Sequence, residues 1–117
     1  MPEAATAALP LWQPSPDRIA KANITAFRTD VERRHGLSLP DYQALWRWSG
    51  DQPALFWREM WSFGRIIGDP GDVVLVDADR MPGARFFPNG RLNFAQNLLR
   101  RSDDTPALIF RGEDKVR

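Results

Sequence analysis

The residues of this chain that could carry chemistry are few. His35 is the single histidine and directly follows Arg34. A histidine can serve as a general base, but it then needs a nucleophile such as Ser or Cys, and none is evident as its partner in the sequence. We interpret His35 instead as a cation at a helix end, where positive charge complements the helix dipole.

Two further groups of residues could form a site. Asp77 and Asp79 project from the same side of an extended stretch and could hold a metal ion or form an acid–base pair. Paired surface acids at a strand end are far commoner, so we assign no site there. Gly83, Gly90 and Gly112 form neither a Gly-x-Gly-x-x-Gly nor a Gly-Lys-Ser/Thr phosphate loop. The sequence therefore predicts no catalytic, cofactor-binding or metal-binding residue.

The aromatic series from Trp46 to Phe63 is the densest cluster in the chain. It could line a ligand pocket, but its helical spacing favours core packing or docking. The 117 residues include five Trp and seven Phe. Large aromatic side chains bury about 150–250 Å² each, whereas a chain of this size buries only about 60–70% of its surface. We therefore expect a partner surface.

Composition excludes several classes of protein. Sixteen basic and fifteen acidic residues are interspersed and give a net charge of +1, which does not suit a nucleic-acid binder. The pairs Arg33–Arg34 and Arg100–Arg101 lie at predicted helix C-termini. There is no Cys, hence no disulfide framework or thiolate zinc site. Without a signal peptide or an apolar run of about 20 residues, we expect a cytoplasmic protein that does not enter a membrane.

The elements expected in the first half are an extended strap and three helical stretches. Prolines around Trp12 favour the strap over residues 1–14, with Leu11 and Trp12 pinning it to a larger body. Ser15-Pro16-Asp17 opens a helix that restarts at Asn23, itself a good cap, and ends at Gly36. Further helices open at Pro40-Asp41, ending at Ser49-Gly50, and at Asp51-Gln52-Pro53, running to Phe63. The last is apolar nearly all round, which is typical of a helix buried on more than one side.

The second half is expected to be less regular. A turn at residues 68–71 precedes an extended run at 73–76, and residues 80–91 are turn-rich. Asn93 caps a helix from Phe94 to Arg101, with Gln96 in capping-box spacing. Residues 107–110 predict a strand, and 115–117 the beginning of its return strand. The fold class is thus mainly α with a short β portion.

The resemblance to a known family begins in this second half. Residues 79–88 are Asp-Arg-Met-Pro-Gly-Ala-Arg-Phe-Phe-Pro, and residues 90–99 are Gly-Arg-Leu-Asn-Phe-Ala-Gln-Asn-Leu-Leu. They resemble the aromatic-Phe-x-x-Gly-x-Leu-Asn-x-x-x-Asn-x-Leu motif that closes the N-terminal segment of acetyl-CoA synthetase-like enzymes. The Met-Pro-Gly-Ala-Arg lead-in and the opening Leu-Trp-Gln-Pro-Ser-Pro are similar to the acetoacetyl-CoA synthetase branch. Phe86 stands where the family usually has Trp, and Gln96 where that branch usually has Glu.

The likeness runs from about Pro10 to Arg111 and implies an adenylate-forming ligase. Such enzymes join a carboxylate to ATP, release pyrophosphate, and let the CoA thiol displace AMP. The family's phosphate loop, ribose-binding Asp and catalytic Lys lie downstream, so the resemblance implies ATP, Mg and CoA only for the parent enzyme. It also implies that 15–101 is a helical region packing on the large α/β AMP-binding domain. Residues 102–117 would begin that domain, cut in its first hairpin, and we expect the 117 residues alone to be inactive.

Two alternatives stay open at this point. The chain could be an independent helical interaction module that binds a partner through its Trp-rich face. It could also be the front of a ligase for acetate or propionate, because the acid pocket would lie elsewhere.

Overall fold

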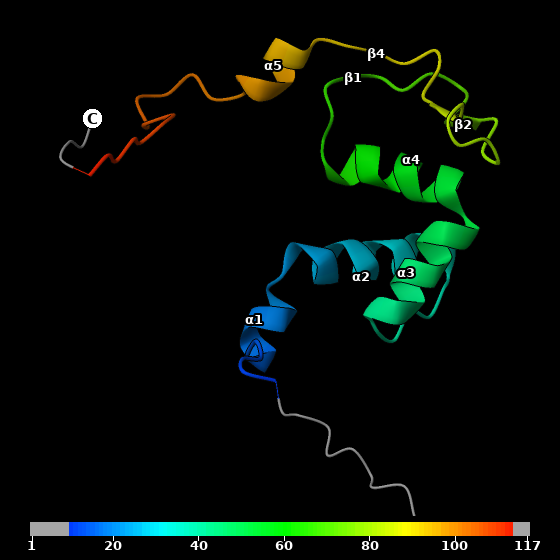
Figure 1. Ribbon diagram of the computed structural model, residues 1–117, viewed down its shortest axis with the longest axis horizontal. Helices are drawn as coiled ribbons and strands as arrows, with labels where there is room; N and C mark the ends of the chain where they lie inside the picture. The colour runs from blue at the N-terminus through cyan, green and yellow to red at the C-terminus, as the bar shows by residue number, and fades with distance from the viewer. Residues whose placement is uncertain (1–9, 114–117) are drawn as a thin grey trace, which may run out of the picture. The chain divides into compact units, whose positions relative to one another are not determined.

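The computed structural model describes residues 10–113, and Figure 1 shows its ribbon coloured along the chain. The chain divides after Phe63 into two units. Its helices and few short antiparallel strands confirm the mainly α class with a short β portion. Sequence analysis placed no boundary at residue 63. No helix among the described residues has the length and apolar character needed to cross a membrane. Each unit is described by itself below.

Four helices lie in the described part of the first unit, residues 10–63. Their bounds are α1 Pro16–Ala20, α2 Asn23–His35, α3 Tyr42–Asp51 and α4 Pro53–Phe63. Before α1, residues 10–14 form no regular element, and the Arg18 guanidinium lies 5.7 Å from the centre of the Trp12 ring. Leu11 is fully exposed in the described chain. The rest of the predicted strap, residues 1–9, lies outside the described residues.

Short polar side chains start two of these helices as predicted. The Ser15 hydroxyl accepts a hydrogen bond from the Arg18 backbone N–H, and Pro16 opens α1. The Asp41 carboxylate caps α3 by accepting from the Ala44 N–H at 2.8 Å. The predicted Asn23 cap is wrong. Ala22 is the N-cap, because its carbonyl already accepts from the residue 25 and 26 N–H groups and so begins the helix one residue earlier.

Two glycines behave differently at the helix ends. Gly36 terminates α2 in the left-handed conformation at φ 62°, and the Leu37 N–H returns to the Glu32 carbonyl, as predicted for a Gly cap. Gly50, by contrast, lies inside α3, which runs to Asp51 rather than stopping at Ser49-Gly50. Pro53 then begins α4 one residue after the α3 C-cap, so the turn between the two helices is very short.

The core of the first unit lies among α2, α3 and α4. Its buried members come from α2, α3 and the loop between them: Phe27, Val31, Leu39, Leu45 and Trp48. Half-buried side chains of α4 pack against them, namely Leu55, Phe56, Met60 and Phe63. Within this unit α4 therefore packs through one face, and Trp57 on another face stays 41% exposed.

The second unit holds two small antiparallel pairs. The outer pair joins β1 Gly68–Asp69 to β4 Arg91–Leu92, and the inner pair joins β2 Leu75–Val76 to β3 Arg85–Phe86. The inner pair thus lies within the loop that the outer pair closes. Strand β3 falls in the stretch 80–91 expected to be irregular, β4 begins at the last residue of that stretch, and β1 lies where a turn was predicted at 68–71. Local sequence did not reveal them, since each is two residues long and depends on a partner far along the chain.

Helix α5, Phe94–Leu98, follows the outer strand pair. Asn93 caps it through its side-chain oxygen, which accepts from the Gln96 N–H at 3.1 Å, as predicted. The helix ends at Leu98 rather than Arg101, because Arg100 turns back and donates through Nε to the Asn97 carbonyl. Residues 107–110, within the described chain, form no strand, which contradicts the prediction. The expected return strand at 115–117 lies outside the described residues.

Candidate functional site

An apolar groove crosses the first unit on the surface of its core. It has a volume of about 370 Å³ and is lined mainly by apolar side chains of α2, α3 and α4: Ile24, Phe27, Tyr42, Leu45, Trp46, Phe56, Met60 and Phe63. Asn23 and Ser49 are its polar lining residues. We call it the α2–α4 groove. Tyr42 and Trp46 stay 61% and 59% exposed, so its rim offers large apolar surfaces to a neighbour.

The aromatic residues split between packing and exposure. Phe27 meets Phe56 and Phe63 edge to face, with ring centroids 5.8 and 5.2 Å apart. Trp48 meets Phe56 in the same manner at 6.2 Å. Offset and T-shaped contacts of this kind stabilise a core beyond simple burial. The series therefore serves first as core, as its helical spacing indicated, while Trp46 remains available for docking.

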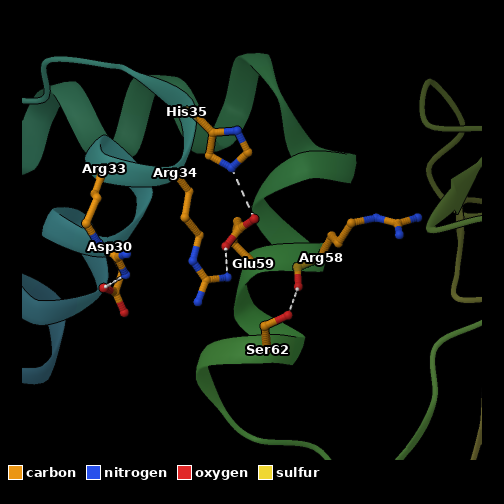
Figure 2. A network of polar contacts seen from close by, with 7 residues as sticks. All are labelled: Asp30, Arg33, Arg34, His35, Arg58, Glu59 and Ser62. Atoms are coloured by element: carbon orange, nitrogen blue, oxygen red, sulfur yellow. Dashed lines mark hydrogen bonds and ion pairs between the residues drawn. The ribbon is translucent and has the colours of Figure 1, made fainter.

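A buried carboxylate joins α2 to α4 (Figure 2). The side chain of Glu59 is only 11% exposed, and both its oxygens are occupied. Oε2 accepts from Arg34 Nη1 at 2.9 Å, and Oε1 lies 3.0 Å from His35 Nε2. Arg34 and His35 both belong to the last turn of α2. We call these three residues the Glu59 cluster.

The Glu59 cluster explains where the predicted His35 lies. His35 is a helix-end residue, as expected, but it contacts a carboxylate and lies 6.2 Å from the Trp48 ring rather than facing solvent. A carboxylate, a histidine and an arginine can serve acid–base chemistry. Here, however, both oxygens of Glu59 are taken up by the two α2 residues. The arrangement is that of a structural junction between α2 and α4.

The other residues that the sequence offered as site candidates do not lie together in one site. Asp77 takes a left-handed conformation at φ 55°, and its Oδ2 lies 3.9 Å from Arg85 Nη2. Asp79 is exposed in the loop before β3. No group of three or more His, Cys, Asp or Glu within the part of the chain that the structure describes could hold a metal ion. Gly83, Gly90 and Gly112 lie at separate places along the second unit.

Asn97 is the most connected polar residue of the second unit. Its Oδ1 accepts from the Ile67 N–H at 2.8 Å, and its Nδ2 donates to the Ile67 carbonyl at 2.8 Å. Nδ2 also donates to the Asn93 carbonyl, and Arg100 Nη2 donates to Oδ1 at 2.8 Å. The Asn97 amide thereby pairs with both backbone groups of Ile67 as a neighbouring strand residue would. It fixes α5 to the chain that leads into β1.

Sequence analysis missed both Glu59 and Asn97 as structural anchors. Glu59 is the one acid in the largely apolar and aromatic α4, which was a usable signal, since a carboxylate on the packed side of such a helix needs a partner. Asn97 is part of the quoted motif, but the motif did not indicate what the side chain binds. Its partner Ile67 is thirty residues away, and no local pattern links the two.

Comparison with known proteins gives one family and several relatives. Residues 42–98 match the family described as acetyl-coenzyme A synthetase N-terminus. The chain is 46% identical over 107 residues to the acetoacetyl-coenzyme A synthetase of Rhizobium meliloti, covering 92% of this chain and 16% of that protein. It is 33% identical over 108 residues to acetoacetyl-CoA synthetase of Macaca fascicularis, covering 90% and 16% respectively.

A third relative carries a different name. Malonamoyl-CoA synthetase of Penicillium aethiopicum is 36% identical over 91 residues, covering 76% of this chain and 12% of that protein. No solved structure matches the chain. The chain thus spans about a sixth or less of the length of these curated relatives.

Proposed function

Because residues 42–98 match the acetyl-coenzyme A synthetase N-terminus family, we propose that the chain belongs to it and is the N-terminal part of an acetoacetate–CoA ligase. The reaction proposed for the whole enzyme converts acetoacetate, ATP and CoA into acetoacetyl-CoA, AMP and pyrophosphate. The observation that carries the proposal is the 46% identity to a bacterial acetoacetyl-coenzyme A synthetase over 92% of the chain. We place the enzyme in the cytoplasm.

The proposed role of these residues is structural. The buried carboxylate of Glu59 is already shared by Arg34 and His35, which gives it a structural role rather than that of a ligand for Mg. The α2–α4 groove is lined almost wholly by apolar carbon and offers no cation to a triphosphate. We therefore place ATP, Mg and CoA, and every catalytic, cofactor-binding and metal-binding residue, in the rest of the enzyme, and derive no reaction step through this chain.

We propose that the partner of the chain is the large AMP-binding domain of its own polypeptide, with 15–101 as the packing region and 102–117 as the start of that domain. The exposed apolar surface supports this. Tyr42 and Trp46 in the first unit and Phe94 in the second are each more than half exposed. An apolar patch of more than a few hundred Å² normally marks an interface.

A chimera tests the proposal. In it, this chain replaces the 107-residue segment of the Rhizobium meliloti relative to which it aligns, and that relative supplies the remainder. Purified chimera is assayed for AMP and pyrophosphate formation that requires both CoA and acetoacetate, with the relative lacking the segment as control. We expect activity in the chimera and none in the 117-residue chain alone. A folded, soluble chimera without acetoacetate-dependent turnover would overturn the proposal.

The same assay addresses the acyl group. Acetate, propionate and malonamate replace acetoacetate in turn, because one relative is a malonamoyl-CoA synthetase. The acid pocket in the chimera comes from the relative, so the decisive version uses the full-length enzyme to which this chain belongs. We expect the highest kcat/KM there for acetoacetate, and a preference for another acid would reassign the substrate.

A second function, an independent interaction module, is favoured by one observation, the open α2–α4 groove with its exposed Tyr42 and Trp46. A module of this kind would be a monodisperse monomer that melts cooperatively by itself. The ligase proposal predicts a 117-residue chain that associates through its uncovered apolar surface. Size-exclusion chromatography and a thermal melt of the purified chain separate these two outcomes.

A further inference from the structure

Helix α5 contacts its own unit through polar groups and exposes its apolar ones. Asn93 and Asn97 stand one turn apart and share a face. Asn97 binds the backbone of Ile67 with Oδ1 and Nδ2, each at 2.8 Å. Phe94 and Leu98, also one turn apart, share a neighbouring face and are 75% and 69% exposed. A surface helix normally does the reverse and packs its apolar face inward.

The attachment of α5 is reinforced at its C-terminal end. Arg100 Nη2 donates to Asn97 Oδ1, Nε donates to the Asn97 carbonyl at 2.9 Å, and Nη1 reaches the Gly64 carbonyl at 3.4 Å. The chain thus uses several directional hydrogen bonds to hold a five-residue helix that buries no side chain. Without that attachment so short a helix would not persist, since isolated helices of this length are unstable in water.

Leu99 extends the exposed apolar surface. It follows Leu98 as the C-cap of α5 and is 73% exposed. We call Phe94, Leu98 and Leu99 the α5 face. Removing three large apolar side chains from water is favourable, so this face can contribute binding energy that the second unit by itself does not use.

We propose that the α5 face is the contact through which the second unit docks on the part of the same polypeptide that follows residue 117, with Asn97 as its positioning residue. This inference rests on the proposed function. The matched segment makes up only 16% of the Rhizobium meliloti relative, so the polypeptide of such a ligase contains a far larger body to cover the face. Since that body would belong to the same polypeptide as α5, it would be present at a high effective concentration at the α5 face.

Site-specific photocross-linking in the chimera described above tests the docking contact. The photoreactive residue p-benzoylphenylalanine replaces Leu98 in one variant and Phe94 in a second, which keeps an aromatic ring and guards against a folding defect. Gln96 is the matched control, because it is exposed on the same helix about half a turn away from Phe94 and Leu98. After irradiation, mass spectrometry identifies the cross-linked peptides.

We expect both variants to cross-link to peptides of the relative's remaining polypeptide, several-fold more than the Gln96 variant does. Adding Asn97→Asp, which removes the Nδ2 donor, should lower that yield several-fold. Cross-links to a second copy, to residues before 118, or at the same level as the Gln96 variant would each overturn the inference. Ligase activity of the unsubstituted chimera is measured in parallel. An active chimera without the cross-link refutes only the docking contact, whereas an inactive one that cross-links refutes the proposed function.

Discussion

Replacing Glu59 with glutamine keeps the size and shape of the side chain, yet it should clearly destabilise the first unit. The carboxylate is 11% exposed and accepts from Arg34 at 2.9 Å while lying 3.0 Å from His35. A hydrogen bond to a charged group contributes about 1.5–3 kcal/mol and a neutral one about 0.5–1.5. The amide keeps one oxygen for Arg34 and turns its NH₂ toward His35. Since Arg34 is 42% exposed, solvent partly screens its interaction with Glu59. The free energy of unfolding should therefore fall by about 2 kcal/mol in total.

The measurement is equilibrium urea unfolding of the 117-residue chain, diluted until the urea midpoint no longer depends on protein concentration, followed by tryptophan fluorescence. All five tryptophans lie in the first unit, so the signal reports on the part of the chain that holds the Glu59 cluster. A small unit with an m-value of about 1–2 kcal/mol/M should then lose about 1–2 M in its urea midpoint. The m-value itself should stay unchanged, because the core is the same.

Asp30→Asn is the matched control. It removes an ion pair of the same helix, Arg33 to Asp30 at 3.0 Å, in which the arginine is 70% exposed. Surface pairs of this type contribute about 0–1 kcal/mol, so its midpoint should hardly move. Equal effects of Glu59→Gln and Asp30→Asn would refute the argument from burial. A double-mutant cycle with Arg34→Met should also be non-additive, and strict additivity would show that Arg34 and Glu59 are not coupled.

Four further substitutions are predicted to change the stability of the same chain or its hydrogen exchange. Gly36→Ala should cost about 1–2 kcal/mol in the urea experiment, because Gly36 is left-handed at φ 62°. Gly50→Ala, inside α3 with open space around its Cα, should stabilise by about 0.5–1 kcal/mol, and the same sign for both substitutions would contradict the helix bounds. Val31→Ala should cost about 2 kcal/mol, since Val31 is the one fully buried side chain among the described residues; a loss below about 0.5 kcal/mol would show that the α2–α4 core is not packed as described. Asn97→Ala should speed amide hydrogen exchange at Ile67 by one to two orders of magnitude, corresponding to about 1.4–2.8 kcal/mol, and unchanged exchange there would exclude the Asn97–Ile67 pairing.

The parts of the fold that sequence predicts are those with a local cause. Ser15, Asp41 and Asn93 each start a helix because a side-chain oxygen reaches an N–H three residues on, and that relation is visible in any four-residue window. Gly36 ends α2 for an equally local reason, its tolerance of positive φ. The spacing of Ile24, Phe27 and Val31 predicts one apolar face of α2, of which Phe27 and Val31 are buried while Ile24 stays 49% exposed.

The parts that sequence does not predict depend on distant partners. Strands β3 and β4 contain two residues each, and only their pairing with β2 and β1 makes them strands. Asn97 resembles any other exposed amide until Ile67 is placed beside it. The end of α5 was overestimated because Arg100 and Arg101 suit a helix C-terminus, whereas the Arg100 side chain itself closes the helix at Leu98.

The candidate site divides in the same way. The exposed apolar surface was foreseen from the number of aromatic residues alone, since so many rings exceed what a chain of this size buries. Which rings are buried was not foreseen, because Trp46 and Trp48 are separated by two positions and differ only in the helix face they occupy. Trp48 is 9% exposed and Trp46 59%. Which of the two rings is buried depends on how α3 is rotated about its own axis relative to α2 and α4.

The concentric arrangement of the two strand pairs has a consequence for how the second unit assembles. The inner pair, Leu75 with Phe86 and Val76 with Arg85, closes a short loop over residues 77–84. Once it has formed, the outer pair of Gly68 with Leu92 joins ends that are already close, which lowers the entropy of closing the longer loop. We therefore expect the inner strand pair to form before the outer pair. Changes of length within residues 77–84 should accordingly be absorbed by the inner loop without disturbing the end of the unit that carries α5.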